Sequence, residues 1–138
     1  MGRRAMLYFV SVIIIFIVTL AFVFFASGEE DEGNIEFLKS YGWEVGRYAV
    51  DEAEVIIPKP FDRVYENYNQ LQLRAGLDLT PYQGMRGRRY TYIVKNYPHT
   101  TDEVRANVIV IDGERVAGDI MTVSSTGFMH SLMYDDAQ

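Results

Sequence analysis

The chain opens with a long apolar stretch that carries no charge. Residues 6–26 (MLYFVSVIIIFIVTLAFVFFA) contain neither proline nor glycine, and their small polar residues are Ser11 and Thr19. As a helix rising 1.5 Å per residue, the stretch would be about 31 Å long, which matches the roughly 30 Å hydrocarbon core of a bilayer. A soluble helix this apolar on every face would need complete burial, which a chain of 138 residues cannot provide. The pattern therefore predicts a transmembrane helix within residues 1–26.

The flanks of this helix predict its orientation. Arg3 and Arg4 precede it, and four acidic residues follow it at 29–32. Because basic flanks stay in the cytoplasm, we expect a single-pass cell-membrane protein with a cytoplasmic N-terminus and an extracytoplasmic remainder. The small residues at 26–28 also fit a signal-peptidase site, and cleavage after Gly28 would give a secreted protein. We favour an uncleaved signal anchor, since the apolar stretch exceeds the roughly 7–15 residues typical of a signal peptide.

The remaining residues divide into a short linker and one folded domain. Residues 27–33 (SGEEDEG) are small or acidic, and we expect them to form an extended, solvated tether. Asn34 is a suitable N-cap for a first helix, which Gly42 would end. We therefore place a single extracytoplasmic domain at residues 34–138, a length that supports one hydrophobic core.

A second helix is expected between Pro60, at its start, and Gly76, in a left-handed position just after its end. Apolar residues with helical spacing form its core-facing stripe. They are Phe61, Val64, Tyr65, Tyr68, Leu71 and Ala75.

Alternating patterns elsewhere in the domain predict β-strands. Their ranges are 43–50, 55–57, 90–95, 104–111 and 116–122, and residues 127–133 form a further strand or a turn. Asp51 and Glu52 are expected to interrupt the first two strands, and residues 77–88 to form an irregular segment. Asp112 and Gly113 predict a two-residue hairpin turn. The fold class is therefore α+β, with an antiparallel sheet of about four strands and two helices on one of its faces.

Charge and composition exclude several functions. The chain has 19 acidic and 13 basic residues, and two of its arginines precede the apolar helix. Since nucleic acids are bound mainly through Lys and Arg contacts with phosphate, we expect no nucleic-acid partner. There is no cysteine, which excludes disulfides, thiol nucleophiles and cysteine-ligated metals. The two histidines, His99 and His130, lack the spacing of a metal site, so we expect neither a metal nor a cofactor.

The one dense basic cluster of the domain lies at residues 84–89 (GMRGRR). Arg86, Arg88 and Arg89, together with two glycines, would present guanidinium groups and backbone N–H groups to an anion. An anionic envelope ligand, or an envelope protein with an acidic surface, would fit such a loop. The alternative is a solvated loop whose arginines pair with local acidic residues.

The lack of a recognisable catalytic motif favours a binding role. Trp43 and Tyr82 are further candidate binding residues, because Trp and Tyr are enriched at interfaces, although packing explains them equally well. We expect a non-enzymatic, membrane-tethered interaction or ligand-binding module. One alternative is a small cell-envelope hydrolase that uses Asp119 and His130. Another is a structural subunit of a membrane complex.

Several segments of the domain resemble one bacterial family. They include FLKSYGWEV, YNQLQ, RYTY and GFMH. The matching positions are 37–45, 57–58, 61, 65, 68–72, 78–79, 82, 89–92, 96–98, 105–107, 118–120 and 127–130. Together they cover nearly all of residues 34–133 and resemble the domain-of-unknown-function family numbered 4830, which occurs mainly in Gram-positive Clostridia and their relatives. The resemblance implies such a source and one extracytoplasmic domain behind a membrane segment, and it transfers no catalytic or ligand residue.

Overall fold

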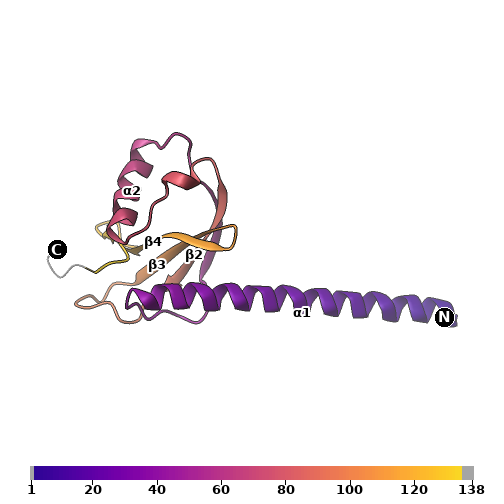
Figure 1. The fold of residues 1–138 in the computed structure, drawn as a ribbon. Helices are drawn as coiled ribbons and strands as arrows, with labels where there is room; N and C mark the ends of the chain where they lie inside the picture. The colour runs from indigo at the N-terminus through magenta and orange to yellow at the C-terminus, as the bar shows by residue number, and fades with distance from the viewer. Residues whose placement is uncertain (1, 135–138) are drawn as a thin grey trace. The chain divides into compact units, whose positions relative to one another are not determined.

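The computed structural model describes residues 2–134, which form helices and one β-sheet (Figure 1). The chain divides into two compact units, one up to Gly33 and one from Asn34 onward. In chain order the elements are α1 (Arg3–Ser40), β1 (Asp51–Ile56), α2 (Arg63–Arg74), the 3₁₀ helix η1 (Thr80–Tyr82), β2 (Arg86–Ile93), β3 (Val104–Ile111), β4 (Glu114–Thr122) and β5 (Met129–His130). The α+β class is confirmed.

Helix α1 is long and apolar enough to cross a membrane. Its most apolar window has a mean hydropathy of 3.0, and none of that window is buried inside the chain. The helix continues through residues 27–33, so the extended tether expected there was wrong. Three glutamates with good helix propensity and the lack of proline are compatible with a helical backbone in this segment, while Gly28 and Gly33 each cost about 1 kcal/mol relative to alanine.

Asn34 lies inside α1 and not at a helix N-cap, which corrects the expected start of a separate first helix. Its side chain is fully buried. The amide nitrogen donates to the Tyr92 hydroxyl at 2.9 Å, and the amide oxygen accepts a hydrogen bond of 2.9 Å from Nε of Arg115. An N-cap side chain would bond to the free backbone N–H groups of the first helical turn. The Asn34 amide bonds instead to these side chains on β2 and β4.

The C-terminal end of α1 is fixed by Gly42, as the sequence predicted. Gly42 has a φ of +92°, a left-handed conformation that glycine adopts without strain. The N–H of Trp43 donates to the Leu38 carbonyl at 3.1 Å, and the N–H of Gly42 donates to the Lys39 carbonyl at 2.9 Å. This pair of bonds is a Schellman motif, and its usual apolar contact is provided by Leu38 and Trp43, which share one core cluster.

Helix α2 confirms the second helix, with two differences. Val64 was expected in the core-facing stripe, but it is 71% exposed, so that position was wrong. Asp62, and not Pro60, is the N-cap, and its carboxylate accepts the N–H of Tyr65 at 2.8 Å. At the other end Gly76 has a φ of +76°, which confirms its expected left-handed position.

The sheet is an antiparallel meander of five strands in the order β1-β2-β3-β4-β5, and Asp112 and Gly113 form the β3–β4 turn with positive φ. The expected strand at 43–50 was wrong, because only Val45 of that segment makes a bridge, to Val94. Strand β1 begins instead at Asp51, where an interruption was expected. Strand β2 begins at Arg86, within a segment that was expected to be irregular.

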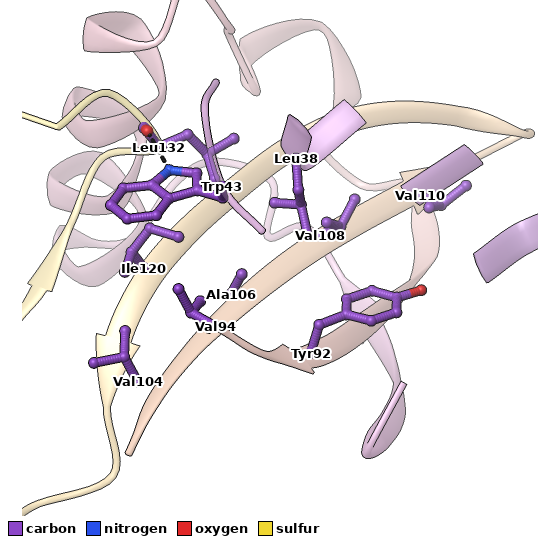
Figure 2. Close-up of a cluster of buried hydrophobic side chains, with 10 residues drawn as sticks. All are labelled: Leu38, Trp43, Tyr92, Val94, Val104, Ala106, Val108, Val110, Ile120 and Leu132. Atoms are coloured by element: carbon purple, nitrogen blue, oxygen red, sulfur yellow. Dashed lines mark hydrogen bonds between the residues drawn. The ribbon is translucent and has the colours of Figure 1, made fainter. Parts of the chain in front are cut away.

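The two faces of the sheet carry separate hydrophobic clusters, because neighbouring side chains on a strand point to opposite faces. On β3, Ala106 and Val108 belong to the first cluster and Ile109 to the second. Figure 2 shows the first cluster, which comprises Leu38, Trp43, Tyr92, Val94, Val104, Ala106, Val108, Val110, Ile120 and Leu132. The second comprises Ile57, Leu79, Ile109, Ile111, Val116 and Ala117.

The helices cover different faces. The last turns of α1 contribute Leu38 to the first cluster. Tyr65 and Tyr68 of α2 pack against the second cluster, on the other face. The expectation that both helices lie on one face was therefore wrong. The residue periodicity shows which side of a helix is buried, but it does not show which face of the sheet that side meets.

Candidate functional site

The three candidate arginines lie on β2, beside the acidic residues of β1. The two strands are antiparallel neighbours. The ion pairs between them, with their nitrogen–oxygen distances, are Arg86–Glu54 (3.3 Å), Arg88–Glu52 (2.9 Å) and Arg89–Asp51 (3.1 Å). Each arginine therefore has a carboxylate partner on the neighbouring strand, which matches the alternative reading of this basic segment as arginines paired with local acids.

The arginines do not converge on one point. Since side chains alternate along β2, Arg86 and Arg88 lie on one face of the sheet and Arg89 lies on the other. The hydrogen bond that Arg88 donates to Glu52 raises the pKa of the guanidinium, because it stabilises the charged form. A single small anion could not contact all three guanidinium groups, and it would compete with carboxylates already in place.

Sequence reasoning missed the acidic half of this arrangement. Asp51 and Glu52 were expected to interrupt strand pairing, yet they begin β1. The sequence DEAEVI does contain a signal, because its acidic positions match in spacing the basic positions of RGRR in β2. That complementarity can be recognised only once the two segments are known to pair, and α2 and η1 separate them in the chain.

Strand β1 forms one edge of the sheet, and alternate backbone groups on it point outward. The N–H of Val94 donates to the Val104 carbonyl at 2.9 Å. In an antiparallel ladder such bonded pairs recur at every second residue. The even-numbered residues of β2 therefore bond to β3, and its odd-numbered residues bond to β1. By the register of β1 and β2, the backbone groups of Glu52, Glu54 and Ile56 point away from the sheet.

Those outward groups are not covered by another part of the chain that the structure describes. Across residues 2–134, no hydrogen bond from another segment reaches the backbone N–H or C=O of Glu52, Glu54 or Ile56. The opposite edge differs, because the N–H of Gly118 on β4 donates to Oε1 of Gln72 on α2 at 2.9 Å. The β1 edge therefore offers a row of unused donors and acceptors.

Trp43 and Tyr82, the two aromatic candidates, lie away from this edge and in different hydrophobic clusters. Trp43 is only 4% exposed, and its indole N–H donates to the Leu132 carbonyl at 2.7 Å. Its ring stacks on Tyr97 with the centroids 5.6 Å apart. Tyr82 ends η1 and packs, half-buried, against the second cluster, whereas Trp43 belongs to the first. Packing explains the positions of both rings.

Asp119 and His130, the pair considered for a hydrolase, have separate partners. Asp119 accepts hydrogen bonds from the Tyr68 hydroxyl at 2.7 Å and from the Asn107 amide at 2.9 Å. His130 contacts the Tyr97 hydroxyl through Nε2 at 3.0 Å and the carbonyl of the following residue through Nδ1. Since His130 pairs with the residue after Asp119 across β4 and β5, the two side chains point to opposite faces. They do not form an acid–base pair.

Asp119 belongs to a buried polar row that joins the sheet to α2. Thr91, Asn107 and Asp119 are opposite one another across β2, β3 and β4. The Thr91 hydroxyl donates to Oδ1 of Asn107 at 2.7 Å. Burial raises the pKa of Asp119, against the lowering effect of its hydrogen bonds, and burial beside Asp119 raises the pKa of Tyr68. Both pKa shifts arise mainly because Asp119 and Tyr68 are buried between the sheet and α2. The side chains of the row form their hydrogen bonds with one another and with Tyr68.

Comparison with known families identifies the domain. The model for the domain-of-unknown-function family DUF4830 matches residues 37–120. The chain belongs to this family. The DUF4830 match covers the end of α1, all of α2, strands β1 to β3 and most of β4, so it includes both the ion-paired strands and the buried polar row. No curated protein and no solved structure matches the chain.

Proposed function

We propose that this DUF4830 protein is a single-pass membrane protein whose domain, from Asn34 onward, lies outside the cytoplasm and binds a protein partner. The observation that carries the proposal is α1, whose apolar part is exposed and whose last turns belong to the domain core. An exposed apolar surface of this length is stable in lipid and costly in water.

The polar side chains in the apolar part of α1 fit a lipid environment. The hydroxyl of Ser11 donates to the Tyr8 carbonyl at 2.9 Å, and that of Thr19 donates to the Ile15 carbonyl at 2.8 Å. Hydroxyl groups that bond to a carbonyl one turn back need no water. The helix therefore supports insertion along the whole apolar stretch.

Retention of the anchor is supported by the backbone around the candidate cleavage site. Residues 26–28 are helical, with helix continuing on both sides. Proteases cut exposed, irregular segments more readily than regular helix. The arginines that precede the helix favour a cytoplasmic N-terminus, and hence an extracytoplasmic domain.

A binding role is supported by what the domain leaves unused. The acidic and basic groups on β1 and β2 are paired, and Asp119 and His130 are bonded within the fold. The outward backbone groups of β1 have no hydrogen-bond partner among residues 2–134. Open strand edges are a common site of protein–protein recognition.

Membrane fractionation combined with intact mass measurement tests the anchor. We expect the full chain to remain in the membrane pellet after alkaline carbonate extraction, at its full mass of 15.9 kDa. The control is a variant in which Ile13→Lys and Ile17→Lys place two charges in the apolar stretch, which should release the protein. Recovery of a soluble product that begins at Glu29 would overturn the proposal of a retained anchor.

A further inference from the structure

We infer that the outer edge of β1 binds an extended segment of a partner protein that carries two basic residues at alternate positions. This inference rests on the proposed binding role and specifies the surface and the chemistry of the partner. It combines three observations on β1: unused backbone groups, two glutamates on one face, and exposed apolar residues at both ends.

The backbone of β1 supplies the register. The outward N–H and C=O groups of Glu52, Glu54 and Ile56 lie two residues apart, which is the spacing with which an added strand forms hydrogen bonds. A partner strand that pairs here would extend the sheet from five strands to six. The other edge provides less backbone for such pairing, since β5 has two residues and Gln72 bonds to the Gly118 N–H of β4.

The side chains of Glu52 and Glu54 supply the charge preference. They lie on the same face of β1, and they are 46% and 54% exposed. On the inner side they pair with Arg88 and Arg86, so their outer side faces the position of an added strand. Lys or Arg at alternate positions of that strand would place each glutamate between two cations, and opposite charges on neighbouring strands stabilise a sheet.

Apolar residues at the ends of β1 extend the recognition. Val50, directly before the strand, is 52% exposed, and Ile56, its last residue, is 56% exposed. An incoming strand with apolar residues on either side of its basic pair would cover both. The partner segment is therefore an apolar–x–basic–x–basic–x–apolar sequence, where x is any residue that tolerates an extended backbone.

A second copy of this chain does not fit the edge. Pairing one β1 with another would place the glutamates of both copies beside each other, and like charges on directly opposite residues destabilise a sheet. The charge pattern therefore favours a different protein and disfavours a dimer through β1.

The test measures binding of a defined peptide to the full chain in neutral detergent micelles. The probe is the acetylated, amidated peptide Val-Thr-Lys-Thr-Lys-Thr-Val with a fluorophore at one end, and the control peptide has Glu in place of both Lys. We expect saturable binding of the lysine peptide that weakens as salt is raised, because exposed charge pairs are screened. The glutamate peptide should not bind.

Hydrogen exchange tests whether the peptide adds as a strand. In the free protein the amides of Glu52, Glu54 and Ile56 should exchange rapidly, whereas those of Asp51 and Ala53 are already bonded to β2. Saturating peptide should protect the three outward amides. Binding without that protection would overturn strand addition at β1.

Variants then locate the contact. Glu52→Gln and Glu54→Gln should each weaken binding about two- to fivefold, the range expected for an exposed ion pair. Glu54→Pro removes an outward N–H that has no partner among residues 2–134, and it should weaken binding by about a further fivefold or more relative to Glu54→Gln. Thermal unfolding of each variant reports whether β1 remains folded.

Two controls separate the edge from other acidic surface. Glu66→Gln, on the exposed side of α2, makes the same charge change away from β1. The double variant Glu29→Gln/Glu32→Gln removes charge from the acidic run in α1. Both should bind the lysine peptide with unchanged affinity. Equal weakening by either control, or no binding of the peptide by the intact protein, would overturn the inference. Either of these results would leave the proposed anchor untouched, because membrane retention and intact mass test the anchor in a separate experiment.

Discussion

Truncation of one leucine in α1 tests whether the end of this helix is part of the domain. Leu38 is fully buried in the first cluster, whereas Leu20 is 62% exposed within the apolar part of the same helix. We compare Leu38→Ala with Leu20→Ala. The two variants make the same chemical change in one helix, and alanine preserves helix propensity in both.

The expected magnitude follows from burial. Replacing a fully buried leucine by alanine costs about 2–5 kcal/mol, because apolar contacts are lost and a cavity remains. A domain of this size has a free energy of unfolding of about 5–15 kcal/mol, so Leu38→Ala should remove a large fraction of its stability. Leu20→Ala should leave domain unfolding unchanged, since its side chain makes no contribution to the core.

The single tryptophan supplies the assay. Trp43 is buried in the same cluster as Leu38, so its fluorescence reports the unfolding of that core. Urea titration of both variants in detergent should give a lower midpoint for Leu38→Ala and an unchanged slope. If both variants unfold at the wild-type midpoint, the end of α1 is not part of the folded domain and the reasoning fails.

Three further changes test other parts of the fold by the same titration. Gly118→Ala should cost about 1–3 kcal/mol, because the new Cβ would lie 2.7 Å from the Asn107 carbonyl oxygen and 2.8 Å from Cδ1 of Leu132. Gly42→Ala should cost about 1 kcal/mol, since φ is +92° there; an unchanged midpoint would contradict the left-handed helix end. Burial raises the pKa of Asp119 above its ordinary value of 3.8, so the stability that this group contributes is present below pH 3.8 and is lost as pH rises through the raised pKa. The free energy of unfolding of Asp119→Asn, relative to that of wild type, should therefore increase as pH rises from 3.8 to neutral. A difference between the two proteins that does not change with pH would contradict burial of the Asp119 carboxylate.

Much of the secondary structure could be predicted because its signals are local. Helix α2, the Asp112–Gly113 turn and the left-handed Gly42 and Gly76 each depend on a few neighbouring residues. Such signals do not require knowledge of the rest of the fold.

The errors arose where tertiary contacts outweighed local preference. Asn34 is a good N-cap residue, yet Tyr92 and Arg115 hold its amide inside a helix. Asp51 has low β-propensity, yet it begins β1, where it forms an ion pair with Arg89 on the neighbouring strand. These partners lie far away in the chain, so the sequence pattern around each residue does not reveal them.

The candidate site was predicted in part. The sequence identified Arg86, Arg88 and Arg89 as the notable basic cluster and left open whether they bind an anion or pair with acidic residues. The strand register decides that they pair, because it places the acidic residues of β1 beside them. The open outer edge of β1 could not be predicted at all, since it depends on which strand ends the sheet.

The absence of cysteine from the chain allows one direct test of the proposed topology. Thr101→Cys places a thiol at an exposed position between β2 and β3, and Gly2→Cys places one before the apolar helix. Intact cells that express each variant are treated with a membrane-impermeant maleimide, before and after permeabilisation. The account predicts labelling of the Thr101→Cys variant in intact cells and of the Gly2→Cys variant only after permeabilisation. The opposite pattern would contradict an extracytoplasmic domain and with it the proposed function.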